Sequence, residues 1–215
     1  MKQIAHFFSW VFLPLFTPMY ALFIVFFIPT QPKNFYLYES LYHYPAQIKT
    51  LYLLLFLVFV VLAPGMSLLV LRYNKSISSL SLEKREERKT PIAIMFFYSI
   101  VLYLFLIFQE DATFIPKALK GMALGGGIAI GIAYLANKYE KISLHGLGVG
   151  ALLGFLYAYF LGLETYDLSI LIVAIMAGAL TLSARLYLKC HTLKQIGLGY
   201  MLGFGTQVLT IYFYP

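Results

Sequence analysis

Long apolar runs alternate with short polar connections along almost the whole chain. Each run is close to the roughly 20 residues that an α-helix needs to cross a bilayer. The runs fall at 7–29, 50–72, 92–109, 117–137, 144–163, 168–188 and 194–213. This pattern predicts an all-α, polytopic membrane bundle of about six to seven transmembrane helices, in which the run at 92–109 is the shortest.

The composition indicates that lipid is the solvent. Of the 215 residues, 61% are hydrophobic and only 12% are charged, whereas a soluble domain is roughly half apolar and about a quarter charged. A soluble core of this length could not bury so much apolar surface, so we expect residues 1–215 to form one integral membrane domain. The first run is long and lacks a small-residue cleavage site, which favours a retained span over a signal peptide.

Prolines and glycines interrupt the apolar runs at positions that matter for packing. Pro14 and Pro18 should kink the first span, and Pro64 the second. Small residues four apart let membrane helices approach closely, so the recurring glycines predict tight contacts between helices. The glycines at this spacing are Gly121 and Gly125, Gly127 and Gly131, Gly146, Gly150 and Gly154, and Gly199 and Gly203.

Basic residues are unequally divided between the two membrane faces. When the loops are assigned alternately from the N-terminus, one face has twelve basic residues and a net charge of +8, and the other has four and −1. We call the first the basic face; its basic residues are Lys2, Arg72, Lys75, Lys84, Arg85, Arg88, Lys89, Lys138, Lys141, Arg185, Lys189 and Lys194. The net charge of +7 is therefore better explained by membrane topology than by nucleic acid binding.

Three polar segments share the basic face, because an even number of predicted spans separates them. They are 84–91, 141–146 and 183–195, and the last two contain His145 and His191. Arginine presents a fixed fork of donors to phosphate oxygens, and histidine can attack phosphorus or protonate a leaving oxygen. The sequence thus predicts a phosphate-binding pocket at the membrane surface. Cys190, the one cysteine, excludes a multi-cysteine metal site.

These segments resemble the signatures of the type 2 phosphatidic acid phosphatase superfamily. Residues 183–195 read S-A-R-x5-H-x3-Q and resemble its third signature, S-R-x5-H-x3-D. Residues 142–146 read I-S-L-H-G and resemble its second signature, P-S-G-H, while residues 85–91 resemble a degraded form of the first, K-x6-R-P. The resemblance covers about residues 80–213 and leaves residues 1–72 as two N-terminal spans outside that core.

The resemblance implies a metal-independent phosphatase that needs no cofactor. His191 would be the nucleophile that forms a phosphohistidine, His145 the general acid, and Gln195 the residue that orients His191. The phosphate-binding residues would be Arg185, Ser143 and Arg88, with Lys84 or Arg85 in place of the family's lysine. The substrate would be a polyprenyl pyrophosphate, phosphatidic acid, a phosphatidylglycerol phosphate or a glycolipid phosphate. Membrane lipids and a second copy of the chain are the other expected partners, and nucleic acid is not.

Departures from the signatures keep alternatives open. Gln195 is neutral where the family has an aspartate, so its oxygen can fix the His191 tautomer but cannot stabilise an imidazolium. Leu144 replaces a glycine. A catalytically weak or inactive relative that binds a phospholipid headgroup or a partner protein therefore remains an alternative. Residues 83–89 are also typical of a self-paired surface turn. A transporter or channel is disfavoured because the charges lie at the ends of the spans.

The charge distribution and the family resemblance predict different sides of the membrane for the site. The excess of Lys and Arg predicts a cytoplasmic basic face. Members of the resembled family commonly place their site on the outer side of the bacterial inner membrane or in a lumen. We expect an integral protein of a bacterial inner membrane, with the charge distribution favouring a cytoplasmic site.

Overall fold

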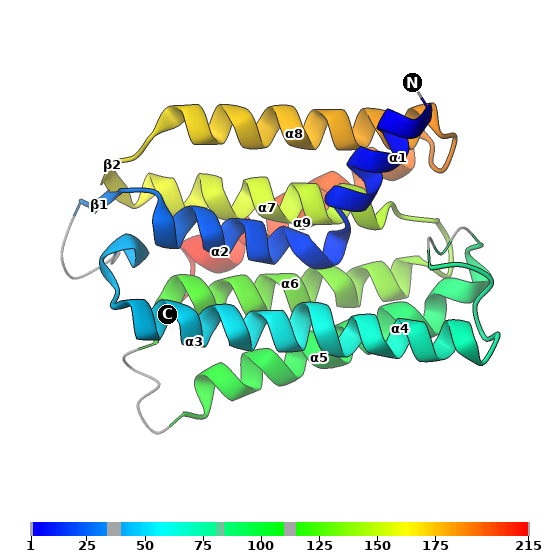
Figure 1. The fold of residues 1–215 in the computed structure, drawn as a ribbon, viewed down its shortest axis with the longest axis horizontal. Coiled ribbons are helices and arrows are strands. Elements are labelled where there is room, and N and C mark those ends of the chain that lie inside the picture. The colour runs from blue at the N-terminus through cyan, green and yellow to red at the C-terminus, as the bar shows by residue number, and fades with distance from the viewer. Residues whose placement is uncertain (1, 34–39, 81, 83, 110–114, 215) are drawn as a thin grey trace.

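The computed structural model describes residues 2–33, 40–80, 82, 84–109 and 115–214, most of which lie in helices that run side by side along one axis (Figure 1). The α-helices are α1 Lys2–Val11, α2 Thr17–Phe27, α3 Ala46–Phe56, α4 Ala63–Tyr73, α5 Lys89–Ile107, α6 Lys117–Ala136, α7 Leu144–Leu161, α8 Leu168–Tyr187 and α9 Leu193–Tyr212. Shorter helical turns are η1 Pro14–Phe16, η2 Leu41–His43, η3 Leu57–Leu62 and η4 Glu86–Arg88. Two short antiparallel strands, β1 Gln31–Pro32 and β2 Leu163–Thr165, pair at one end of the bundle.

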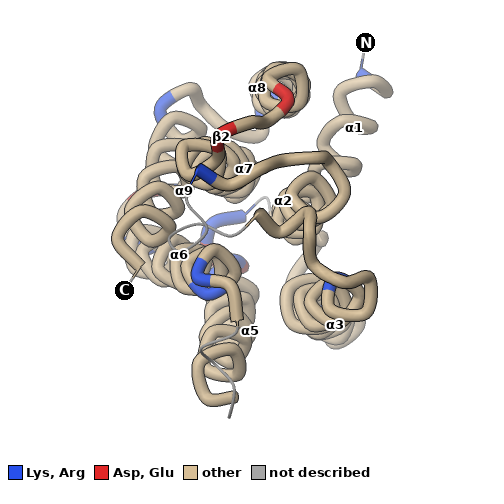
Figure 2. The backbone as a smooth tube through the Cα atoms, turned by 90° about the vertical axis from the view of Figure 1, so that its left-hand side faces the viewer, with Lys and Arg blue, Asp and Glu red and all other residues tan. Residues whose placement is uncertain are grey.

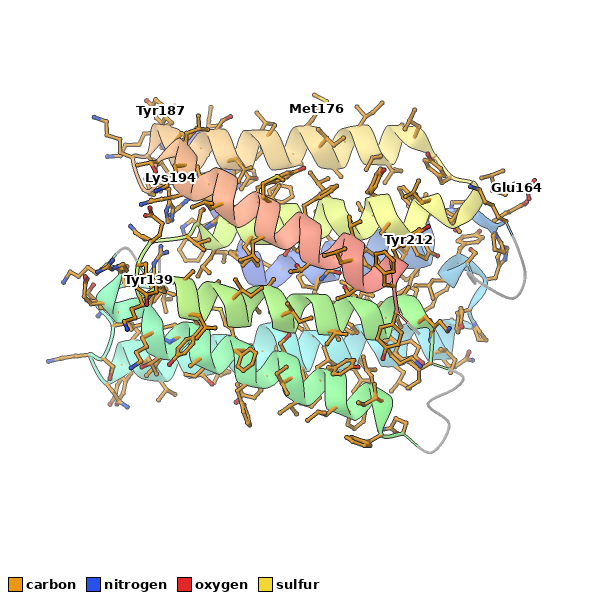
Figure 3. All side chains as sticks on the ribbon, turned by 180° about the vertical axis from the view of Figure 1, so that it is seen from behind. Tyr139, Glu164, Met176, Tyr187, Lys194 and Tyr212 are labelled. Carbon is orange, nitrogen blue, oxygen red and sulfur yellow. The ribbon has the colours of Figure 1, made fainter. Side chains whose placement is uncertain are left out.

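Within the described residues, five helical segments are long and apolar enough to cross a membrane. They are Ala46–Tyr73, Glu86–Ile107, Lys117–Ala136, Leu144–Leu161 and Leu168–Tyr187. Large apolar side chains cover the outside of the bundle, among them Met176, which Figure 3 labels. Outward-facing apolar side chains are expected where lipid is the solvent. The chain is therefore an integral membrane protein, and the predicted all-α bundle is confirmed.

The first and last predicted spans differ from these five. The run at 7–29 is divided at Pro14 into α1 and α2, and α1 turns away from α2 to lie along α8 (Figure 1). Proline has no amide hydrogen, so the helical hydrogen-bond pattern is interrupted where the kink was predicted. The run at 194–213 forms α9, which has 20 residues but many glycines and the polar residues Thr206, Gln207 and Thr210.

Pro64 has a different consequence in the second predicted span. Helix α3, η3 and α4 form one continuous segment of 28 residues, and η3, just before Pro64, is a π-helix. A π-helical turn is one way in which a helix absorbs a residue that cannot donate a backbone hydrogen bond. The wide turn lies against the bundle, where Phe59 and Val61 contribute to the apolar core.

Glycines bring α7 and α9 into direct backbone contact. A Cβ added to Gly150 would overlap the carbonyl of Tyr200, and one added to Gly203 would overlap that of Leu147. Seen end-on, α7 is surrounded by α2, α8 and α9 (Figure 2), and it is the most buried of the five spans. The glycine spacing thus predicted a real helix contact. The contact between α7 and α9 places the first turns of the two helices side by side.

Candidate phosphate site at the basic face

The three polar segments meet at one end of the bundle. Tyr139, Tyr187 and Lys194 lie at this end in Figure 3, and Glu164 lies at the other. A partly open cavity of about 430 Å³ is lined here mainly by residues of α1, η1, α4, α7 and α8 and by the connections before α5 and α9. Among its lining residues, those with polar side chains are His6, Ser9, Arg88, His145, Arg185, Cys190 and His191. Four of the residues predicted for the site, Arg88, His145, Arg185 and His191, therefore share one cavity.

Arg88 ties the three polar segments together. It is the last residue of η4, and its side chain is buried. Its Nε donates to the Leu82 carbonyl at 2.7 Å, and its Nη1 donates to the Ile142 carbonyl at 2.8 Å. Its Nη2 donates to His191 Nε2 at 3.3 Å. A rigid guanidinium is thus fixed beside the proposed nucleophile, with its edge at the cavity.

Arg185 is the second buried guanidinium of the cavity. It lies in the last turn of α8, is only 6% exposed, and its Nε has no hydrogen-bond partner within the described residues. Helix α8 then ends in a left-handed residue, Lys189 (φ 55°), and the Cys190 N–H donates to the Arg185 carbonyl at 3.1 Å. This reversal, typical of a helix C-terminus, leads the chain directly to His191.

His191 is held in the tautomer that a nucleophile requires. Its Nδ1 lies 3.1 Å from Gln195 Oε1, and an amide oxygen can only accept a hydrogen bond. Nδ1 therefore carries the proton, and Nε2, which accepts from Arg88, keeps its lone pair. Burial, followed by the positive charge of Arg88, lowers the pKa of His191 to about 3. The imidazole is therefore neutral at neutral pH.

Gln195 is itself held by groups that the sequence did not identify. The Thr192 N–H donates to Gln195 Oε1 at 3.3 Å, and the Gln195 N–H donates to Thr192 Oγ1 at 3.3 Å, which forms a capping box at the start of α9. On its other side, Gln195 Nε2 donates to Glu140 Oε1 at 3.0 Å. A capping-box pattern at residues 192–195 could have been found from the sequence, but the contact with Glu140 could not.

His145 faces the same cavity from the first turn of α7. Its Nε2 lies 3.0 Å from the Ser9 carbonyl, so this nitrogen carries a proton and donates it. Ser9 belongs to α1, outside the region that the signatures cover, and its buried hydroxyl has no partner within the described residues. The N-terminal helix therefore contributes to the site, which the sequence did not indicate.

Three predicted phosphate-binding residues do not line the cavity. Lys84 is exposed and pairs with Glu87 at 3.3 Å, and Arg85 lies 3.9 Å from Glu86 and donates to the Tyr139 carbonyl. These pairs form the surface turn that residues 83–89 also predicted; Glu83 lies outside the described residues. Ser143 is fully buried, and its hydroxyl accepts from the Gly146 N–H as the N-cap of α7.

Apart from these groups, the cavity is apolar. Trp10, Leu13, Leu62, Met66 and Leu69 line it between α1 and α4. Leu144, which stands where the resembled second signature has a glycine, lines both this cavity and a smaller one of about 90 Å³ deeper in the bundle. The two cavities also share Pro14, Leu15 and Met95. The polar end is therefore continuous with apolar walls inside the membrane region.

The charge of the cavity is unbalanced. Two buried guanidiniums line it, and within the described residues no Asp or Glu does. An unpaired buried charge is costly, and proteins normally place a partner or a ligand beside it. The arrangement favours an anion with an apolar tail. Comparison with known protein families, curated proteins and solved structures gives no match to this chain.

Proposed function

We propose that this protein hydrolyses a lipid phosphate or pyrophosphate at the basic face through a phosphohistidine intermediate. The observation that carries the proposal is the cavity in which Arg88, Arg185 and a neutral His191 meet without a lining carboxylate among the described residues. Positive charge around the phosphoryl oxygens and an oriented nucleophile are what phosphoryl transfer requires. The proposal assigns the chain to the type 2 phosphatidic acid phosphatases that its signatures resemble.

The proposed reaction has two steps. His191 Nε2 attacks phosphorus and the bond to the leaving oxygen breaks. His145 enters this step as an imidazolium: its Nε2–H stays on the Ser9 carbonyl, and it transfers its Nδ1 proton to the leaving oxygen. Water then attacks the phosphohistidine, His145 accepts a proton from the water, and inorganic phosphate leaves with regeneration of neutral His191. Arg88 and Arg185 hold the equatorial oxygens throughout, because their guanidinium donors complement the charge that develops there.

The apolar walls support a lipid as the substrate. A hydrocarbon chain attached to the phosphate would lie between α1 and α4, against Leu62, Met66 and Leu69. Its burial there replaces contact with bilayer lipid by contact with protein, so the phosphate provides the specificity. Polyprenyl pyrophosphate, phosphatidic acid, phosphatidylglycerol phosphate and glycolipid phosphate all have this form.

One observation favours a headgroup-binding protein without turnover as the second candidate. The site has fewer phosphate donors than the signatures imply, because Lys84 and Arg85 are in the surface turn and the Ser143 hydroxyl is the N-cap of α7. Such a protein would bind lipid phosphates through Arg88 and Arg185 and release no phosphate.

Phosphate release from the four lipid classes, measured with purified protein in nanodiscs, separates the candidates. We expect hydrolysis of at least one class, undiminished by EDTA, and a loss of at least about a thousandfold in His191→Ala because the nucleophile is removed. His43→Ala, at an exposed histidine of η2, is the matched control and should keep full activity. Binding of all four lipids without release would refute the hydrolase and support the second candidate.

The site is proposed to face the cytoplasm of a bacterial inner membrane, because the basic residues gather on its side of the bundle. A cysteine introduced by Lys75→Cys, in a Cys190→Ala background, reports the side directly. Labelling by a membrane-impermeant maleimide only after cell lysis is the expected result. Labelling of intact cells would place the site outside.

A further inference from the structure

Glu140 is the only carboxylate that the described residues bring into contact with the proposed catalytic groups, although it does not line the cavity. It lies in the connection between α6 and α7. Its Oε1 accepts from Gln195 Nε2 at 3.0 Å, and its Oε2 accepts from Lys194 Nζ at 3.0 Å. The Lys141 N–H also donates to Oε1, at 3.1 Å. The bonds from Lys194, Gln195 and the Lys141 N–H, in that order, lower the pKa of Glu140, so its carboxyl group is ionised at neutral pH.

We propose that Glu140 is a positioning residue, whose carboxylate fixes the Gln195 amide so that its oxygen faces His191 Nδ1. Together the two side chains take the place of the aspartate in the resembled signature. The catalytic part of this inference rests on the proposed function. The structural part, the tautomer of His191, does not.

The physical reason is the near symmetry of an amide. Rotation of the Gln195 amide by half a turn exchanges Oε1 and Nε2 with little change in shape. The rotated amide would present an N–H to His191 Nδ1, which then has to accept, and the proton would move to Nε2. With that proton, Nε2 has no lone pair with which to attack phosphorus. A carboxylate accepts only, so Glu140 favours the orientation in which Nε2 points to it.

The Thr192 N–H supports the same orientation, since it donates to Gln195 Oε1. With a backbone donor on one side and a carboxylate on the other, the Gln195 amide can form both hydrogen bonds in only one orientation. The Lys194 contact is different: its side chain is 73% exposed, and a surface pair of this kind contributes little. Lys194→Met is therefore a matched control that removes the ion pair and leaves the contact between Glu140 and Gln195.

The tautomer can be measured without any substrate. In protein labelled with ¹⁵N at histidine and held in detergent micelles, we expect His191 to show a protonated Nδ1 and an unprotonated Nε2. Glu140→Ala should introduce the opposite tautomer as a second population, and Lys194→Met should not. An unchanged His191 spectrum in Glu140→Ala would overturn the inference.

An exchange of the two groups tests the catalytic consequence. Gln195→Glu alone places two carboxylates in contact and should reduce kcat by about tenfold or more, with KM nearly unchanged. Adding Glu140→Gln restores one carboxylate and one amide at the same two positions, so the double variant should regain kcat to within about threefold of wild type. Failure of the double variant to recover, while it remains folded by circular dichroism, would contradict the positioning role.

The proposed function and the role of Glu140 can be refuted independently of each other. A wild-type protein that releases no phosphate from any lipid class refutes the proposed function, and the histidine spectrum still decides whether Glu140 sets the tautomer. A wild-type protein that is active, with Glu140→Ala equal to it in kcat and in tautomer, refutes the inference and leaves the proposed function standing.

Discussion

Within the described part of the chain, one buried polar cluster lies at each end of the bundle, and the two differ in charge and in hydrogen bonding. The opposite-face cluster consists of Thr30, Ser40 and Tyr159. Tyr159 Oη accepts from the Leu41 N–H at 2.8 Å, and the Thr30 and Ser40 hydroxyls lie 2.8 Å apart. These side chains are uncharged, all have partners, and none lines either cavity.

The basic-face cluster consists of Arg88, His145, Arg185 and His191. It carries charge, it surrounds a cavity, and the Arg185 Nε is left without a partner within the described residues. A satisfied neutral network stabilises one arrangement of the chain, whereas a charged, incompletely paired one favours the binding of an opposite charge. Under the proposed function, the opposite-face cluster would serve folding and the basic-face cluster ligand binding.

The strongest separation of the two roles is expected at Arg185. Arg185→Met should reduce kcat/KM by about a hundredfold, because donors to the developing phosphoryl charge are lost. The same change should leave the melting temperature unchanged or raise it, because it removes an uncompensated buried charge. Arg72→Met, at an exposed arginine of α4 on the same face, should alter neither quantity. A clear loss of stability in Arg185→Met would show that the guanidinium has a structural partner instead.

Tyr159 should show the reverse behaviour. Tyr159→Phe leaves the buried Leu41 N–H without its acceptor, which should lower the free energy of unfolding by about 1–3 kcal/mol. The activity per folded molecule should stay within about twofold, because the change is at the far end of the bundle. Tyr157→Phe, at an exposed tyrosine of the same helix, is the control, and thermal melting in detergent is the measurement. A loss of activity without a loss of stability would contradict the division.

A further contrast is expected in the pH dependence of stability. Burial lowers the pKa of His191 from 6.5 to about 3, so between these values the unfolded chain binds a proton that the folded protein excludes. The stability that the folded protein gains from a neutral His191 is fully present above pH 6.5 and is lost as the pH falls toward 3. His191→Gln should therefore lose less melting temperature than wild type between pH 7 and pH 4. Tyr159→Phe should show the wild-type change in melting temperature with pH. An equal change in all three proteins would refute a buried, neutral His191.

The sequence anticipated the bundle better than it anticipated the site. Apolar runs indicated the spans, and glycine spacing indicated close helix packing, because lipid solvent and close helix approach constrain residue types over long segments. That α7 and α9 are the helices in contact came from the structure. At residues 84–88, by contrast, one turn contains both an exposed, self-paired Lys84 and a buried Arg88. Which basic residue points inward depends on the rotation of that turn, and the spacing of residues in the sequence does not specify this rotation.

The missed residues have the same explanation. Glu140 and Ser9 are unremarkable in the sequence, and neither belongs to a signature. Each becomes part of the site through a partner far along the chain, Gln195 for Glu140 and His145 for Ser9.

By itself, the sequence determined that the chain is a membrane helical bundle with its basic residues gathered on one face, because transfer of apolar and charged groups between water and lipid depends on composition along the chain. Only the tertiary structure decided which charged groups are buried together, which hydrogen bonds fix the His191 tautomer, and that α1 lines the cavity. Those outcomes depend on angles and contacts of a few ångströms between distant segments, and hydropathy does not specify them.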